Sequence, residues 1–163
     1  EVVAIDPHAG NDRGPNEIEG FANEAESDHQ IFNSNLAAAG VAPDQIDTVV
    51  LTQMHGDHIG GLMGEAGATF ANARYVTGAV EHNHWSGAAN EGFEAKVKPL
   101  NDKITMLDDG GSVASGITAL AAFGHSPGHM AYMLESGGMR LAITARPRVP
   151  CSKMRSSSSI ATG

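Results

Sequence analysis

Short apolar runs separated by glycine-containing turns dominate the hydrophobic pattern of the chain. Runs of this length, rich in β-branched residues, predict buried strands. The clearest run, 46–51, ends directly at a polar segment that contains glycine. The pattern predicts strands at 2–5, 46–51, 73–77, 103–107, 113, 117–122, 131–135 and 139–144. The glycine pairs at 110–111 and 137–138 predict hairpins, the first of them joining 103–107 to 113.

Two helices are expected between these strands. Ser27 is a suitable N-cap for a helix that runs to Ala39, and Asp28 in its first turn favours the helix dipole. Gly40 is a suitable C′ residue for the same helix. A second helix is expected to begin near Gly78 and to carry Glu81, His82, His84 and Trp85.

The candidate chemistry follows the strand at 46–51. Within six positions the chain has four side chains that can hold a metal or work beside one: Gln53, His55, Asp57 and His58. In α/β proteins the carboxyl ends of strands usually carry the chemistry. Imidazole nitrogen and carboxylate oxygen suit zinc, and also iron or manganese. Gly60 and Gly61 would let a helix begin close to such a metal.

A second segment of the same kind, 123–130, also follows a predicted strand and contains His125 and His129. The remaining histidines are less suited to a metal site. His8 is expected on a solvated loop, and His82 and His84 point to different faces of their helix. Asp6, which ends the first strand, is expected to order the neighbouring loop by hydrogen bonds.

Segment 53–61 resembles the His-x-His-x-Asp-His signature of the metallo-β-lactamase superfamily, and 123–130 resembles its Gly-His-Thr-Pro-Gly-His loop. The resemblance covers about 2–145 and implies an α+β fold, an αββα sandwich that is incomplete in its C-terminal half. It assigns His55 and His125 to a first metal, Asp57 and His58 to a second, and a structural or supporting role to His129. One or two zinc ions are therefore expected, with iron or manganese as alternatives. Gln53 stands where the family has its first histidine, and its amide is a weaker donor than imidazole, so the first site should be weakened.

The resemblance stops at residue 146. Arg146 stands where the family has an aspartate that bridges two metals, and a cation there would repel them. Residues 146–163 are basic and serine-rich, whereas all 19 acidic residues lie before them. We expect 1–145 to form a partial domain and 146–163 to be a disordered tail, from a shifted reading frame or another unrelated join. The family's last metal histidine has no counterpart, and the first residue is not Met, so a fragment or a processed chain is expected.

The length and composition of the chain limit the kinds of partner that it is expected to have. At 163 residues the chain is one domain's length, enough for a sizeable core. The net charge of −9 argues against nucleic acid. No run of eighteen apolar residues occurs, so no membrane span is encoded. The single cysteine, Cys151, cannot form an internal disulfide.

The resemblance implies a metal-dependent hydrolase that acts on a small molecule. A bound metal lowers the pKa of water and polarises the bond under attack, and Asp57 would orient that water or accept its proton. The sequences of both segments are most similar to the branch with methyl parathion hydrolase and lactonase-like enzymes, which implies an ester, lactone or phosphotriester substrate. A β-lactam is the alternative substrate. The alternative of a different class is a truncated, non-catalytic domain that keeps a partial metal site.

Overall fold

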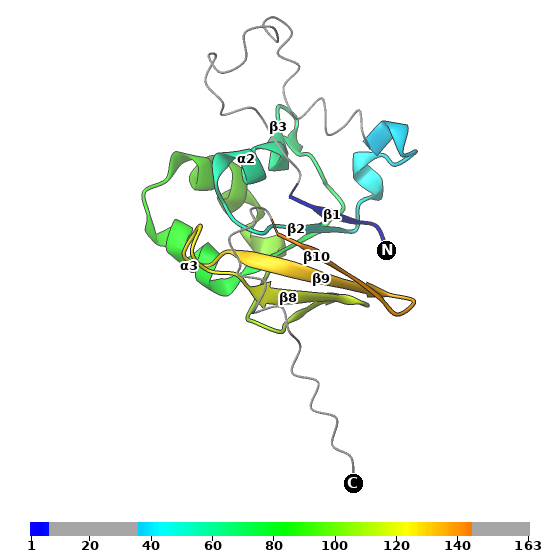
Figure 1. Cartoon of the computed structure of the whole chain (residues 1–163). Helices are drawn as coiled ribbons and strands as arrows, with labels where there is room; N and C mark the ends of the chain where they lie inside the picture. Colours follow the sequence, from blue (N-terminus) through cyan, green and yellow to red (C-terminus); the bar gives the residue numbers. More distant parts are fainter. Residues whose placement is uncertain (7–35, 145–163) are drawn as a thin grey trace, which may run out of the picture.

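Two four-stranded sheets packed face to face form the centre of the structure, a computed structural model that describes residues 1–6 and 36–144 (Figure 1). The first sheet is parallel and has the strand order β1-β2-β5-β6. Its strands are β1 (Val3–Ile5), β2 (Thr48–Val50), β5 (Arg74–Gly78) and β6 (Ile104–Leu107). The second is antiparallel, with the order β10-β9-β8-β7. Its strands are β7 (Ser112–Ala114), β8 (Ile117–Ala121), β9 (Met130–Ser136) and β10 (Met139–Ile143).

Short helices and one small hairpin connect the strands of the first sheet. The hairpin consists of β3 (Met63–Gly64) and β4 (Gly67–Ala68). The helices are η1 (Pro43–Gln45), α2 (Gly56–Ile59), η2 (Gly60–Leu62), α3 (Ala79–Gly87), η3 (Phe93–Val97) and η4 (Lys98–Lys103). None of the helices in the described ranges is an apolar segment of bilayer-spanning length.

Strand alternation explains why the first sheet has two buried faces. Successive residues of a strand point to opposite sides. Val49 and Tyr75 accordingly pack into the core under the helices, whereas Val50 and Val76 pack into the core between the sheets. Both cores are formed from the apolar runs seen in the sequence, and the predicted α+β architecture is confirmed.

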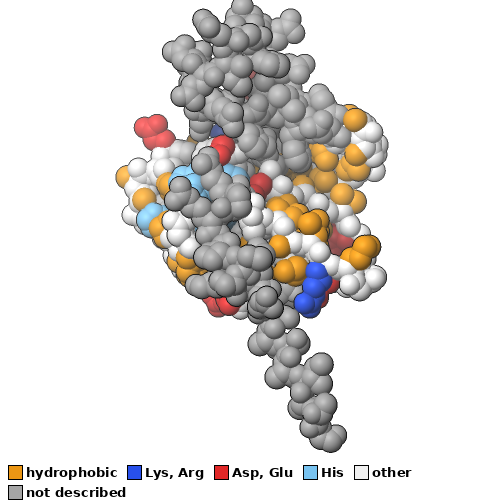
Figure 2. All heavy atoms as spheres, in the orientation of Figure 1, with side chains coloured by type: hydrophobic (Ala, Val, Ile, Leu, Met, Phe, Trp, Pro, Cys, Tyr) orange, Lys and Arg blue, Asp and Glu red, His pale blue; other side chains and the backbone are white. Residues whose placement is uncertain are grey.

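The helices of the described part of the chain pack against the first sheet and one another, so they cover only one side of the sandwich. Met139 and Leu141 remain exposed on β10, the edge strand of the second sheet, on the face that Tyr132 and Leu134 of β9 turn towards the first sheet. Figure 2 shows hydrophobic side chains among polar ones over the region of β8–β10. The described residues thus form three layers of an αββα sandwich, as expected for an incomplete fold.

Most predicted elements are confirmed, including the β9–β10 hairpin, whose turn places Gly137 and Gly138 at φ 56° and 79°. The end of the first predicted helix is also confirmed. Gly40 has φ 73°, its N–H donates to Ala37 O, and the N–H of Val41 donates to Leu36 O. This is the hydrogen-bond pattern of a Schellman C-cap.

Two predictions were wrong. Strands β6 and β7 do not form a hairpin, because β6 pairs in parallel with β5 while β7 pairs with β8 in the other sheet. The turn at Gly110 therefore crosses between the sheets. The helix that was expected to begin at Gly60 begins at Gly56, so Asp57 and His58 are helical residues. The helix begins this early because the extended His55 acts as its N-cap, and Gly56, which lacks a Cβ, follows directly as the first helical residue.

Several predictions concern residues outside the described ranges. These are the loop position of His8, the start of the first helix at Ser27, the cation at Arg146, the free Cys151 and the disordered tail 146–163.

The two buried tyrosines give a prediction for alkaline unfolding. Burial raises the pKa of Tyr75 to about 12, and burial together with the charge of Asp6 raises the pKa of Tyr132 further. Unfolded tyrosine ionises near pH 10. The unfolded state therefore loses protons first, and the free energy of unfolding should fall as the pH rises from about 10 towards 12.

These are the only tyrosines in the chain, so tyrosinate absorbance reports on the core alone. We expect tyrosinate to appear above about pH 11, together with loss of the far-ultraviolet circular dichroism signal. Tyrosinate formation near pH 10 in a protein that keeps its circular dichroism would contradict this burial.

Candidate metal centre

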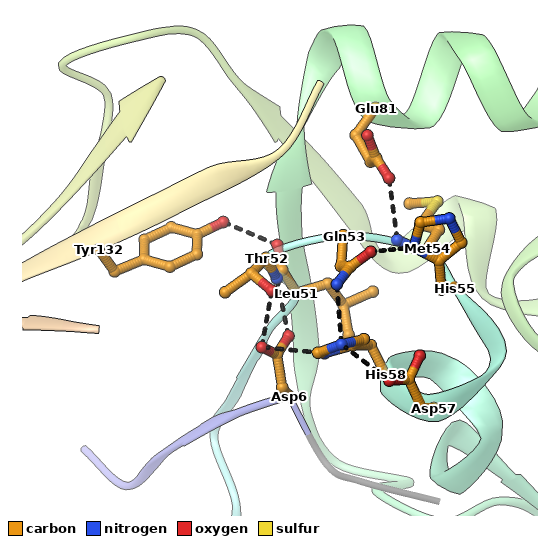
Figure 3. A network of polar contacts seen from close by, with 10 residues as sticks. All are labelled: Asp6, Leu51, Thr52, Gln53, Met54, His55, Asp57, His58, Glu81 and Tyr132. Atoms are coloured by element: carbon orange, nitrogen blue, oxygen red, sulfur yellow. Dashed lines mark hydrogen bonds and ion pairs between the residues drawn. The ribbon is translucent and has the colours of Figure 1, made fainter. Parts of the chain in front are cut away.

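The first segment with candidate metal ligands, residues 53–58, follows β2 as predicted and spans the loop before α2 and the first turn of that helix (Figure 3). Residues 51–54 of this loop are buried, with Gln53 fully so. His55 is extended, at φ −69° and ψ 157°, and α2 begins at the next residue. Asp57 and His58 are therefore presented in the first turn of a helix beside the end of a parallel strand.

Gln53 lies between the two histidines of this segment (Figure 3). Its Oε1 contacts Nδ1 of His55, and its Nε2 lies 2.8 Å from Nε2 of His58. An amide oxygen only accepts and an amide nitrogen only donates. Gln53 thus fixes the tautomers, with the proton of His55 on Nδ1 and the lone pair of His58 on Nε2.

Asp6 anchors the same loop from the end of β1. Its carboxylate accepts hydrogen bonds from the N–H and the hydroxyl of Thr52 at 2.8 and 2.7 Å, and lies 3.2 Å from Nδ1 of His58. Asp6 has φ 46°, the one positive φ outside glycine within 1–6 and 36–144. Such a conformation is costly and persists where surrounding contacts hold it. The expected role of Asp6 in ordering the loop by hydrogen bonds is confirmed.

Asp57 is the more accessible carboxylate. Its side chain is 33% exposed, and its Oδ2 lies 3.4 Å from Nε2 of His58. The centre therefore has one carboxylate that is held in the loop network, Asp6 at the end of β1, and one that is partly exposed, Asp57 of the segment itself.

The second segment joins β8 to β9 and meets the first in space. The ring centroids of His125 and His55 lie 5.0 Å apart, although seventy positions separate them in the chain. His125 is exposed, whereas His129 is buried with its ring 5.7 Å from that of His125. Of the four predicted metal-binding residues, the structure thus brings His55 beside His125, and Asp57 beside His58.

Burial lowers the pKa of His55, and the nearby His125 lowers it further, while Asp57 and Glu81 oppose the change. Burial and His125 likewise lower the pKa of His129. Both imidazoles are thereby held in the neutral form near neutral pH. Neutral imidazole is the form that binds metals.

The donor types of this centre fit a divalent metal, because imidazole nitrogen and carboxylate and amide oxygens are ligands that such ions accept. Their arrangement is that of a hydrogen-bonded set. In the described part of the chain, no three His, Cys, Asp or Glu side chains converge as a metal-binding group. The amide of Gln53 occupies the space between His55 and His58.

Two residues of α3 border the centre. The ring of Trp85 lies edge-on to that of His55, at 5.2 Å. Glu81 is fully buried and accepts hydrogen bonds from both metal-type segments, a role that the sequence did not indicate. By contrast, His82 contacts Asn101, at 3.0 Å, and packs on Phe93.

Comparison with protein families matches residues 9–156 to the metallo-beta-lactamase superfamily. The chain belongs to this superfamily. A search of curated proteins found no significant match to the chain.

Solved structures share the metallo-β-lactamase fold. A probable metal-dependent hydrolase from Staphylococcus aureus is 27% identical with a TM-score of 0.66, over 86% of this chain and 52% of that one. AidC, a dizinc quorum-quenching lactonase in complex with a product, is 22% identical with a TM-score of 0.65, over 86% and 50%. AbOPH, a hydrolase of the beta-lactamase superfamily, is 25% identical with a TM-score of 0.60, over 69% and 45%. The chain spans about half the length of these structures.

Proposed function

We propose that this chain is a zinc-dependent hydrolase of a small molecule with an ester, lactone or phosphotriester bond. The observation that carries the proposal is the meeting of His55 and His125, from two separate loops, at 5.0 Å. The partly exposed Asp57 lies beside His58 on the first of these loops. Two of the similar structures are described as a dizinc lactonase and a probable metal-dependent hydrolase, which supports this reaction class.

Each residue has a distinct part in this proposal. His55 and His125 would hold a first ion, with the amide oxygen of Gln53 as a weak third donor. Asp57 and His58 would hold a second. A bound divalent ion supplies a more acidic water and polarises the bond under attack. Asp57, the accessible carboxylate, orients the attacking water and accepts its proton.

The test measures metal content and turnover on one preparation. We expect zinc at fewer than two ions per chain, hydrolysis of a phenyl ester, a lactone or a phosphotriester, loss of turnover on chelation and recovery with added zinc. A β-lactam belongs in the same panel as the alternative substrate. Turnover that survives complete removal of metal would overturn the proposal.

The competing function is a non-catalytic domain with a partial metal site. It is favoured by one observation, the hydrogen-bonded Gln53 between His55 and His58 where a metal-binding group would be open. Zinc binding without turnover of any substrate in the panel would establish this alternative.

Gln53→His is expected to raise zinc affinity at least about tenfold, because imidazole replaces a neutral amide as donor. The position is fully buried between two other histidines, so the new ring is directed towards them. Competition with a chromophoric chelator measures the change, and any hydrolytic rate should rise with it. An unchanged or lower affinity would mean that Gln53 is already a competent donor, or that it acts only by holding the histidines.

A further inference from the structure

We infer that Glu81 is a positioning residue that sets the distance between His55 and His125. This inference rests on the proposed function for its catalytic meaning, but the geometry behind it is independent of any metal. Glu81 lies in the first turn of α3, with none of its surface exposed. A buried carboxylate is costly unless hydrogen bonds compensate it.

Four donors satisfy this carboxylate. Oε1 accepts from the N–H of Met54 at 3.0 Å and from the indole N–H of Trp85 at 2.7 Å. Oε2 accepts from the hydroxyl of Ser126 at 2.6 Å and from the N–H of Gly128 at 2.9 Å. Two acceptor bonds on each oxygen fill the capacity of a carboxylate, which has no proton to donate when ionised.

The positions of the donors explain the positioning role. Met54 immediately precedes His55, and Ser126 immediately follows His125. The carboxylate of Glu81, a rigid group of three atoms, thus joins the backbone of the first loop to the second loop on the far side of the centre. Because Trp85 lies 5.2 Å from His55, the fourth bond also fixes the wall beside that ring.

Close packing keeps the second loop against α3. A Cβ on Gly128 would lie 2.0 Å from the backbone nitrogen of Glu81, and a Cβ on Gly78 would lie 3.0 Å from Gly128 O. The loop and the helix therefore approach at backbone distance, which places the Glu81 carboxylate between the two histidine loops. Hydrogen bonds to a charged acceptor are stronger and shorter than neutral ones.

Glu81→Gln tests this role because it keeps the shape but turns an amide N–H₂ towards donors. In the metal-free protein we expect the nuclear Overhauser contact between the His55 and His125 rings to weaken, and the ring resonances of both to shift. The amides of Met54 and Gly128 should exchange at least about tenfold faster, since both lose a charged acceptor. Tyr75→Phe, which removes another buried hydrogen bond away from these loops, is the matched control and should leave all of these signals unchanged.

Ser126→Ala provides a milder variant, because it removes only one of the four donors. It should shift the His55 resonances on the opposite loop, and this shift should vanish in the Glu81→Gln background. Folded variants with unchanged His55 and His125 signals would overturn the inference.

Zinc affinity gives the second readout. Glu81→Gln should weaken zinc binding at least about tenfold, the usual effect of losing a group that orients metal ligands, while Tyr75→Phe should not. An equal loss in both variants would reduce Glu81 to a stabilising residue. If the unaltered chain binds no zinc, the proposed function fails, whereas the metal-free resonances still decide the role of Glu81.

Discussion

Gly128→Ala is expected to cost at least about 3 kcal/mol of the free energy of unfolding. The new Cβ would lie 2.0 Å from the nitrogen and 2.5 Å from the Cα of Glu81, and 2.5 Å from the carbonyl carbon of Val80. These are backbone atoms at the start of α3, so no side-chain rotation can relieve the overlap. Urea unfolding followed by circular dichroism measures the loss.

Gly87→Ala is the matched control, because a Cβ at this last residue of α3 meets nothing within 4 Å. Alanine is the better helix former, so the control should be neutral or slightly stabilising. Equal stability of the two alanine variants would show that the loop and α3 are not packed at backbone distance.

Asp57→Asn is expected to lower kcat by about 10²–10⁴-fold on whichever substrate is turned over, because an amide cannot accept the proton of the attacking water. The fold should be little affected, since the side chain is 33% exposed and asparagine has nearly the same shape. Zinc content must be measured on the same sample, as Asp57 is also assigned to the second ion.

Asp102→Asn, at an exposed position of η4, controls for the loss of one negative charge and should keep the full rate. An Asp57→Asn variant that retains both its zinc and its full rate would remove Asp57 from the reaction.

The loops of the centre were predictable because their signals are local. An apolar run followed by a glycine-containing set of metal-type side chains placed 53–58 after β2, and the same reasoning placed 123–130 after β8. The β6–β7 hairpin was mispredicted for a physical reason. A glycine turn between two strands has the same local pattern whether the strands pair or enter different sheets, and only the pairing of β6 with β5 decides between them.

Glu81 was missed because its partners are distant in sequence. A glutamate in the first turn of a helix is ordinarily a solvated residue that favours the helix dipole. Its burial is determined by Met54, 27 positions earlier, and by Ser126 and Gly128, 45 and 47 positions later.

Trp85 makes the centre optically visible. It is the only tryptophan in the chain, its indole is bonded to Glu81, and its ring lies edge-on to that of His55. Protonated imidazole quenches indole emission, and the lowered pKa of His55 keeps this quencher neutral below the ordinary histidine range. His84 also lies edge-on to Trp85, at 5.4 Å, so the intrinsic fluorescence of the chain reports, without a label, on the charge of His55 together with that of His84.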